Sequence, residues 1–132
     1  MKRSIYFFIL LAVFWINSCS SGINTGDLYG EWKYLKVEEL HDPSQNLSAQ
    51  EVAEQSPSIR FSEDGKLVIM WGGKILSHGK FKMEGNIIRY TEDLPGGTTR
   101  PIPFLIKEIN SKKLVFETMA QESTRITAEK ID

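Results

Sequence analysis

The sequence predicts an all-β domain, namely an eight-stranded antiparallel up-and-down barrel with one short helix in the loop after the first strand. After residue 27, eight short segments show apolar-polar alternation or an enrichment in β-branched and aromatic residues, and mostly short turns separate them. Asp64-Gly65 is a strong hairpin signal between two of these segments. Strands that follow one another through hairpins can close into a barrel, which removes exposed strand edges.

The first predicted strand covers residues 28–37. Leu28, Trp32 and Tyr34 share one face of a period-two pattern, and charged residues occupy the other face. Gly30 lets a neighbouring group approach the backbone closely. This pattern indicates a half-buried strand with Trp32 directed toward the core.

Seven further strands complete the predicted barrel, at residues 59–62, 67–71, 74–83, 87–90, 104–109, 114–119 and 123–131. The segment 92–103 is expected to be irregular, because it contains Pro95-Gly96-Gly97 and two more prolines, Pro101 and Pro103.

A short helix is predicted at Ala49–Gln55. Ser48 and Glu51 have the spacing of a capping box, with Leu47 and Val52 placed as a hydrophobic staple. The helix is either a lid over the barrel or a simple connector. In an up-and-down barrel, segments 41–58 and 92–103 lie at the same end, so a ligand is expected to enter there past Leu47, Val52, Leu94 and Ile102.

The N-terminus has the three parts of a secretion signal. Lys2 and Arg3 precede an apolar run of 12 residues, 5–16, which is too short to span a bilayer comfortably. We therefore predict a signal peptide at 1–18, a flexible Ser/Gly-rich tether at 19–27 and one folded domain at 28–132.

Composition and motifs argue against several function classes. Without Lys2 and Arg3, 14 of the 16 basic residues remain against 17 acidic ones, so the mature chain is no nucleic-acid binder. His41 and His78 are the only histidines, and they belong to no metal-binding or catalytic motif. The sequence predicts no enzyme, no metal and no cofactor.

Many aromatic residues lie on the predicted strands, and they allow two interpretations. They could line an apolar pocket with a few polar orienting groups, or they could form the core, which is favoured for most of them because aromatic rings dominate small cores. The candidate ligand-binding residues are Tyr34, Phe61, Trp71, Phe81, Arg89, Tyr90, Phe104 and Phe116.

Three motifs carry a resemblance to a known family. Gly30-x-Trp32 and the hairpins at 59–67 and 79–88 resemble the short lipocalin-like domains of Bacteroidetes-type bacterial lipoproteins. The resemblance implies that Arg125, on the last strand, packs across Trp32. The chain departs from the larger lipocalins in lacking their Thr-Asp-Tyr type motif and in being shorter.

The residues around Cys19, the chain's only cysteine, resemble a lipoprotein cleavage box, although Asn17 stands where a small residue is usual. This resemblance implies a lipid on Cys19 as the membrane anchor. Ser20 then implies an outer-membrane lipoprotein that faces the periplasm or the exterior.

Two functions remain open. The first is a membrane-anchored protein that binds a small apolar or amphipathic ligand in its barrel. The second is an interaction or inhibitor module with a filled barrel and an envelope protein as its partner. A ligand cavity would favour the first, and a solid core with an exposed apolar patch would favour the second.

Overall fold

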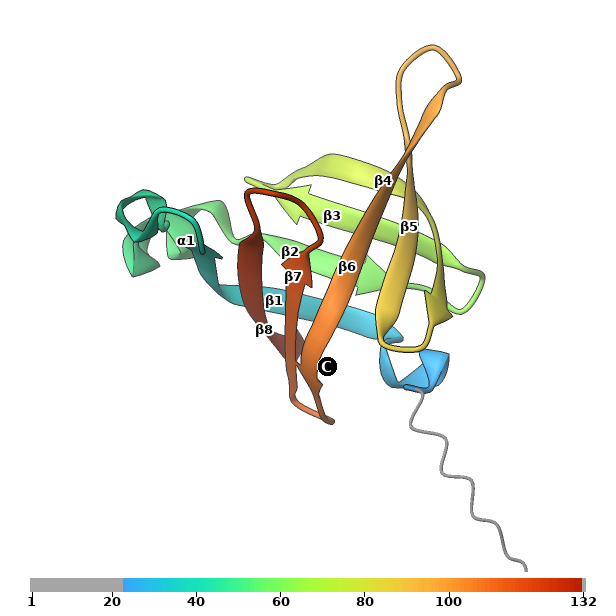
Figure 1. Cartoon of the computed structure of the whole chain (residues 1–132), viewed down its shortest axis with the longest axis horizontal. Coiled ribbons are helices and arrows are strands. Elements are labelled where there is room, and N and C mark those ends of the chain that lie inside the picture. The colour runs from blue at the N-terminus through green and yellow to red at the C-terminus, as the bar shows by residue number, and fades with distance from the viewer. Residues whose placement is uncertain (1–22, 132) are drawn as a thin grey trace, which may run out of the picture.

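The structure, a computed structural model, describes residues 23–131 and confirms the predicted architecture (Figure 1). Eight antiparallel strands form a closed barrel in the sequential order β1 to β8, with one short α-helix after β1. The strands are β1 (Gly30–Glu39), β2 (Ser58–Phe61), β3 (Lys66–Trp71), β4 (Lys74–Glu84), β5 (Ile87–Asp93), β6 (Thr99–Ile109), β7 (Lys113–Thr118) and β8 (Thr124–Ile131). The other elements are α1 (Ala49–Gln55) and the 3-10 turns η2 (Thr25–Asp27) and η3 (Pro43–Gln45).

The predicted signal peptide and Cys19 lie outside the described residues. Within residues 23–131, no helix is long and apolar enough to cross a membrane.

The N-terminal segment of the described chain closes one end of the barrel. Residues 23–27, which the sequence assigns to the tether, are folded: η2 precedes the fully buried Leu28, and Ile23 packs against the core. The indole Nε1 of Trp32 donates to the carbonyl oxygen of Leu28 at 2.9 Å. The folded domain therefore begins before residue 28, since this segment fills what would otherwise be an opening.

Trp32 is fully buried, as its place in the strand pattern predicts. The cation that lies over its ring is Lys130, with Nζ 4.5 Å from the ring centroid. A Cβ atom on Gly30 would lie 2.7 Å from Cε of Lys130, so this glycine makes room for the lysine. The expected packing of Arg125 on Trp32 is wrong, because Arg125 pairs with Glu38 of β1 in the register and donates to Glu117 at 2.9 Å.

Helix α1 has the predicted bounds and the predicted capping box. Ser48 Oγ accepts from the Glu51 backbone N–H at 3.1 Å, and Glu51 Oε1 accepts from the Ser48 N–H at 2.9 Å. Val52 is buried in the core cluster, and α1 contacts β1.

The β5–β6 hairpin differs most from the prediction. The expected irregular segment 92–103 is mostly strand, and only residues 94–98 lie between β5 and β6. The carbonyl oxygen of Pro103 accepts from the Met119 N–H, so the backbone groups of Pro103 face β7. Backbone directions alternate along a strand, so Pro101 faces the same side. Because β7 ends at Thr118, no N–H is needed on that side of these two prolines. The prolines thus cost no bond to β5, and the hairpin extends beyond the rest of the barrel (Figure 1).

Candidate functional site at the open rim of the barrel

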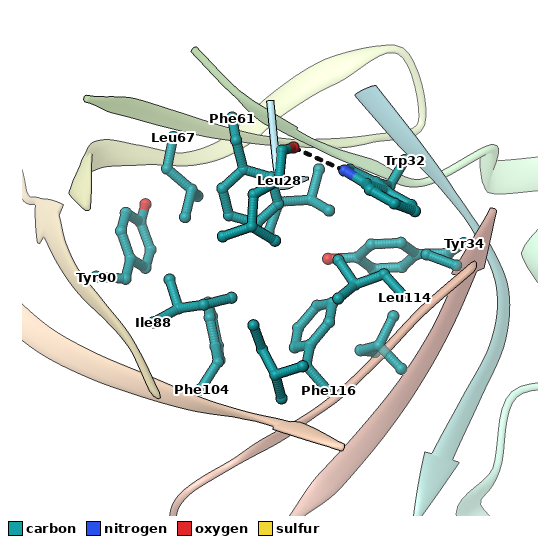
Figure 2. Close-up of a cluster of buried hydrophobic side chains, with 14 of the residues drawn as sticks. Leu28, Trp32, Tyr34, Phe61, Leu67, Ile88, Tyr90, Phe104, Leu114 and Phe116 are labelled. Atoms are coloured by element: carbon teal, nitrogen blue, oxygen red, sulfur yellow. Dashed lines mark hydrogen bonds between the residues drawn. The ribbon is translucent and has the colours of Figure 1, made fainter. Parts of the chain in front are cut away.

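Most of the candidate ligand-binding rings form the core. Tyr34, Phe61, Phe81, Tyr90, Phe104 and Phe116 are all buried. Their centroids are 5.1 Å apart for Phe61–Phe81, 5.9 Å for Tyr90–Phe104, 5.1 Å for Phe104–Phe116 and 6.3 Å for Tyr34–Phe116. Figure 2 shows the side chains of Tyr34, Phe61, Tyr90, Phe104 and Phe116 directed into the barrel from strands around it. At such separations the rings stabilise one another, which supports core over pocket for these six.

The remaining two candidates lie elsewhere. Trp71 is partly buried at the end of β3. Arg89 points outward from β5, and its Nε donates to Glu84 at 2.9 Å. The idea that Arg89 orients a ligand inside the barrel is therefore wrong, because the alternation along β5 puts Ile88 and Tyr90 inside and Arg89 outside.

Three hollows in the described surface are lined mainly by outward-facing residues. The first, about 620 Å³, lies beside Leu105 and the β7–β8 connection, and the second, about 410 Å³, beside Arg89 and Lys82. The third, about 390 Å³, lies against β4 beside Ile75 and His78. Of the candidate ligand-binding residues, only Phe81 and Arg89 line one of these three hollows, the second.

One end of the barrel, which we call the open rim, carries the β1–β2, β3–β4, β5–β6 and β7–β8 connections. The up-and-down order places these four at the same end, as predicted for 41–58 and the β5–β6 connection. Two backbone bonds join neighbouring connections: Gly72 N–H to Gln55 O at 2.7 Å and Leu40 N–H to Ser123 O at 3.0 Å. However, α1 and the β5–β6 hairpin point in different directions in Figure 1, so they do not converge over one opening.

A polar cluster lies at the rim, where the inward face of β5 continues from Ile88 and Tyr90 to Glu92. Glu92 is buried; its Oε2 accepts from Ser77 Oγ at 2.6 Å, and its Oε1 accepts from Arg100 Nε and Nη2 at 3.0 and 2.6 Å. The Tyr90 hydroxyl lies 2.6 Å from Ser77 Oγ. The cluster holds β4, β5 and β6 together at the rim.

The pKa values of this cluster follow from its contacts. Burial by itself would raise the pKa of Glu92, but the hydrogen bonds from Ser77 and Arg100 outweigh it, and the pKa is lowered. Burial raises the pKa of Tyr90, so its hydroxyl stays protonated. At neutral pH, Glu92 is therefore an ionised acceptor.

The open rim also exposes large apolar side chains. Ile75 and Leu76 at the start of β4 are 59% and 62% exposed, Leu40 follows β1, and Met119 follows β7. Sequence reasoning did not single out these exposed residues, and of the Glu92 cluster it named only Tyr90 as a candidate. Glu92 and Arg100 are register partners across the hairpin, so recognising 99–103 as strand would have placed them opposite each other.

Among residues 23–131, no three His, Cys, Asp or Glu side chains gather as a metal site. No protein-family model matches the chain, and no curated protein matches it either.

Proposed function

We propose that the protein is a lipid-anchored lipoprotein of the bacterial envelope whose lipocalin-like barrel binds a protein partner through the open rim. The packing of the six rings carries this proposal, because their side chains occupy space that a deep ligand pocket would need. Exposed apolar side chains at one end of a small barrel support it, since apolar surface that is exposed to water favours association.

The proposed anchor rests on the N-terminal sequence alone. Cys19 follows a basic segment and an apolar run, and acyl chains on it would hold the protein at the membrane, with each buried methylene adding about 0.8 kcal/mol. Cys19→Ser should block processing and shift the protein out of the membrane fraction. Unchanged processing and fractionation would overturn this part of the proposal.

The proposed partner can be sought by cross-linking in cells. A photoreactive amino acid at Met119 or Leu76 should give a cross-linked species of one defined mass. The same group at Ile131, which is exposed at the closed end of the barrel, serves as the matched control and should give none. A cross-link of equal yield at all three positions would indicate random collision and would contradict a rim-specific partner.

A second candidate function is binding of a small amphipathic ligand at the open rim. It is favoured by the Glu92 cluster, in which the 59% exposed Arg100 side chain would contact a polar head group while the partly buried Ile102, two residues along β6, would contact an apolar part. Native mass spectrometry of the purified protein separates the two candidates. A single co-purifying molecule that Arg100→Gln removes would favour the ligand, and a spectrum with protein alone would favour the interaction module.

A further inference from the structure

Strand β4 is longer than the part of it that pairs with β5. The β4–β5 register runs from Glu84 only to Gly79, which lies opposite Glu92, whereas pairing with β3 continues to Lys74. Residues 74–78 therefore have β3 on one side and no strand on the other among the described residues. We call this stretch the free β4 edge.

The backbone of this stretch offers unpaired groups to a partner. Phe81 donates its N–H to Gly65 O, on the β3 side of the strand. Because backbone directions alternate along a strand, the N–H of His78, three residues earlier, points away from β3. The β3–β4 register shifts between Ile69 and Met70, which leaves Leu76 in a β-bulge and interrupts this alternation. A strand edge with unpaired backbone groups is a template for an added strand.

The separation of β4 from β5 is built into the side-chain contacts. A Cβ atom on Gly79 would collide with the carbonyl oxygen of Thr91, so only glycine permits the close crossing at which the strands part. Beyond that point, Ser77 donates to Glu92, and His78 Nδ1 lies 3.5 Å from a carboxylate oxygen of Asp93. These side-chain contacts link β4 to β5 beyond the point where their backbone pairing ends.

At the open rim, two other strands extend by several residues beyond a neighbour, and both are protected. At the closed end, residues 82–84 of β4 and 107–109 of β6 also lie beyond a neighbouring strand. In β1, residues 34–39 lie beyond the pairing with β2, and they bond instead to the segment that joins β1 to β2. The Tyr34 N–H donates to the Pro57 carbonyl oxygen, and the Leu47 N–H donates to that of Val37. The Glu39 N–H donates to Asn46 Oδ1. In β6, the part beyond β7 carries Pro101 and Pro103, which lack the N–H that an added strand needs. The free β4 edge has neither a loop bonded to it nor a proline, and the bulge at Leu76 is the one irregularity within it.

Side chains at this edge suit an extended partner with apolar and acidic residues. Ile75 and Leu76 are more than half exposed, and the hollow of about 390 Å³ lies against Val68, Ile75 and His78. Lys74 and Lys80 make no ion pair with any described residue.

We infer that the free β4 edge binds an extended segment of a partner protein, in which acidic residues alternate with apolar ones, by adding it to the sheet as a ninth strand. The inference rests on the proposed interaction function and names its site and partner chemistry. Backbone pairing supplies the attraction, Ile75 and Leu76 supply apolar contact, and Lys74 and Lys80 select the acidic partner.

A second copy of this chain fits the edge less well. Antiparallel self-pairing centred on Leu76 would place Lys74 of each copy diagonally across from Lys80 of the other copy. Like charges that face each other across strands are destabilising.

The test uses the full-length processed protein in detergent and a fluorescent seven-residue peptide of alternating glutamate and valine. The peptide should bind saturably and slow amide hydrogen exchange at residues 74–78. A peptide with the same side chains but N-methylated at alternate residues should lose binding, because it cannot pair with the backbone. Leu76→Gln, which removes the apolar contact without adding charge, should weaken binding about tenfold or more, whereas the control Leu35→Gln should leave it unchanged.

Each contrary outcome has a distinct meaning. Equal binding of the N-methylated peptide, or no binding of either peptide, would overturn strand addition. A concentration-dependent dimer that protects residues 74–78 would show that the occupant is a second copy. Cross-links in cells at Met119 without any at Leu76 would overturn partner binding at the free β4 edge and would leave the proposed interaction function in place. A co-purifying small molecule without any cross-links would overturn the interaction function itself.

Discussion

At the closed end of the barrel, Leu28 and Trp32 are fully buried and joined by a hydrogen bond, whereas at the open rim Ile75 and Leu76 are more than half exposed. The closed end is apolar and sealed by the N-terminal segment. The rim holds an ionised carboxylate, Glu92, and a strand edge without a partner. The difference teaches that this small domain buries its apolar side chains at one end and exposes several of them at the other.

The largest effect is expected from Trp32→Ala. It removes a fully buried indole and leaves the Leu28 carbonyl without its donor, so unfolding free energy should fall by about 3–5 kcal/mol. That is a large part of the roughly 5–15 kcal/mol typical of a domain. Chemical denaturation measures the loss. The matched rim variant Leu76→Ala should change stability by no more than about 0.5 kcal/mol, and equal losses in both variants would contradict the comparison.

An intermediate effect is expected from Glu92→Gln at the rim. The folded pKa of Glu92 lies below its ordinary value of 4.5, so its contribution is complete above that value and is lost as the pH falls through the folded pKa. Gln keeps the shape of the side chain but not its charge, so the free energy of unfolding at pH 7 should fall by about 1 kcal/mol.

The pH dependence checks this interpretation. Below pH 4.5, the stability difference between Glu92→Gln and the parent protein should shrink. Glu31→Gln is the positive control and should show the same kind of pH dependence, because hydrogen bonds from Ser58 and Arg60 also lower the pKa of Glu31. If Glu92→Gln differed from the parent by the same amount at every pH, the Glu92 carboxylate would have no special environment.

The smallest effect concerns the cation over Trp32. Lys130→Gln should cost about 0.5–1 kcal/mol and should shift the fluorescence of Trp32, because it removes a charge near the ring. Arg125→Gln should leave that fluorescence unchanged, since Arg125 contacts Glu117. A fluorescence shift in the Arg125 variant alone would reverse the assignment.

The sequence predicts the barrel well because local rules decide its elements. The period-two pattern of residues 28–37 and the capping box of Ser48 and Glu51 act within a few residues, and both are confirmed. The β5–β6 hairpin was predicted less well. Pro101 and Pro103 exclude a central strand by local rules, yet a strand that extends beyond its neighbour has one side on which no N–H is needed.

The candidate site could be predicted only in part, because it depends on register and on the neighbours of each strand. The β1–β8 register shifts between Tyr34 and Lys36, and pairing sets Lys130, rather than Arg125, beside Trp32. A ring such as Phe104 has the same sequence pattern in a core as in a pocket, and only its packing against Phe116 distinguishes the two.

The closed end also sets how the protein would stand on a membrane. Ile23 packs against the core, and it lies only four positions after Cys19. Fully extended chain covers at most about 3.6 Å per residue, so a lipid on Cys19 would keep that end within about 14 Å of its attachment point. The barrel would then stand with its closed end toward the bilayer. The rim and the free β4 edge would face away from the membrane, where a partner strand could approach without crossing the lipid head groups.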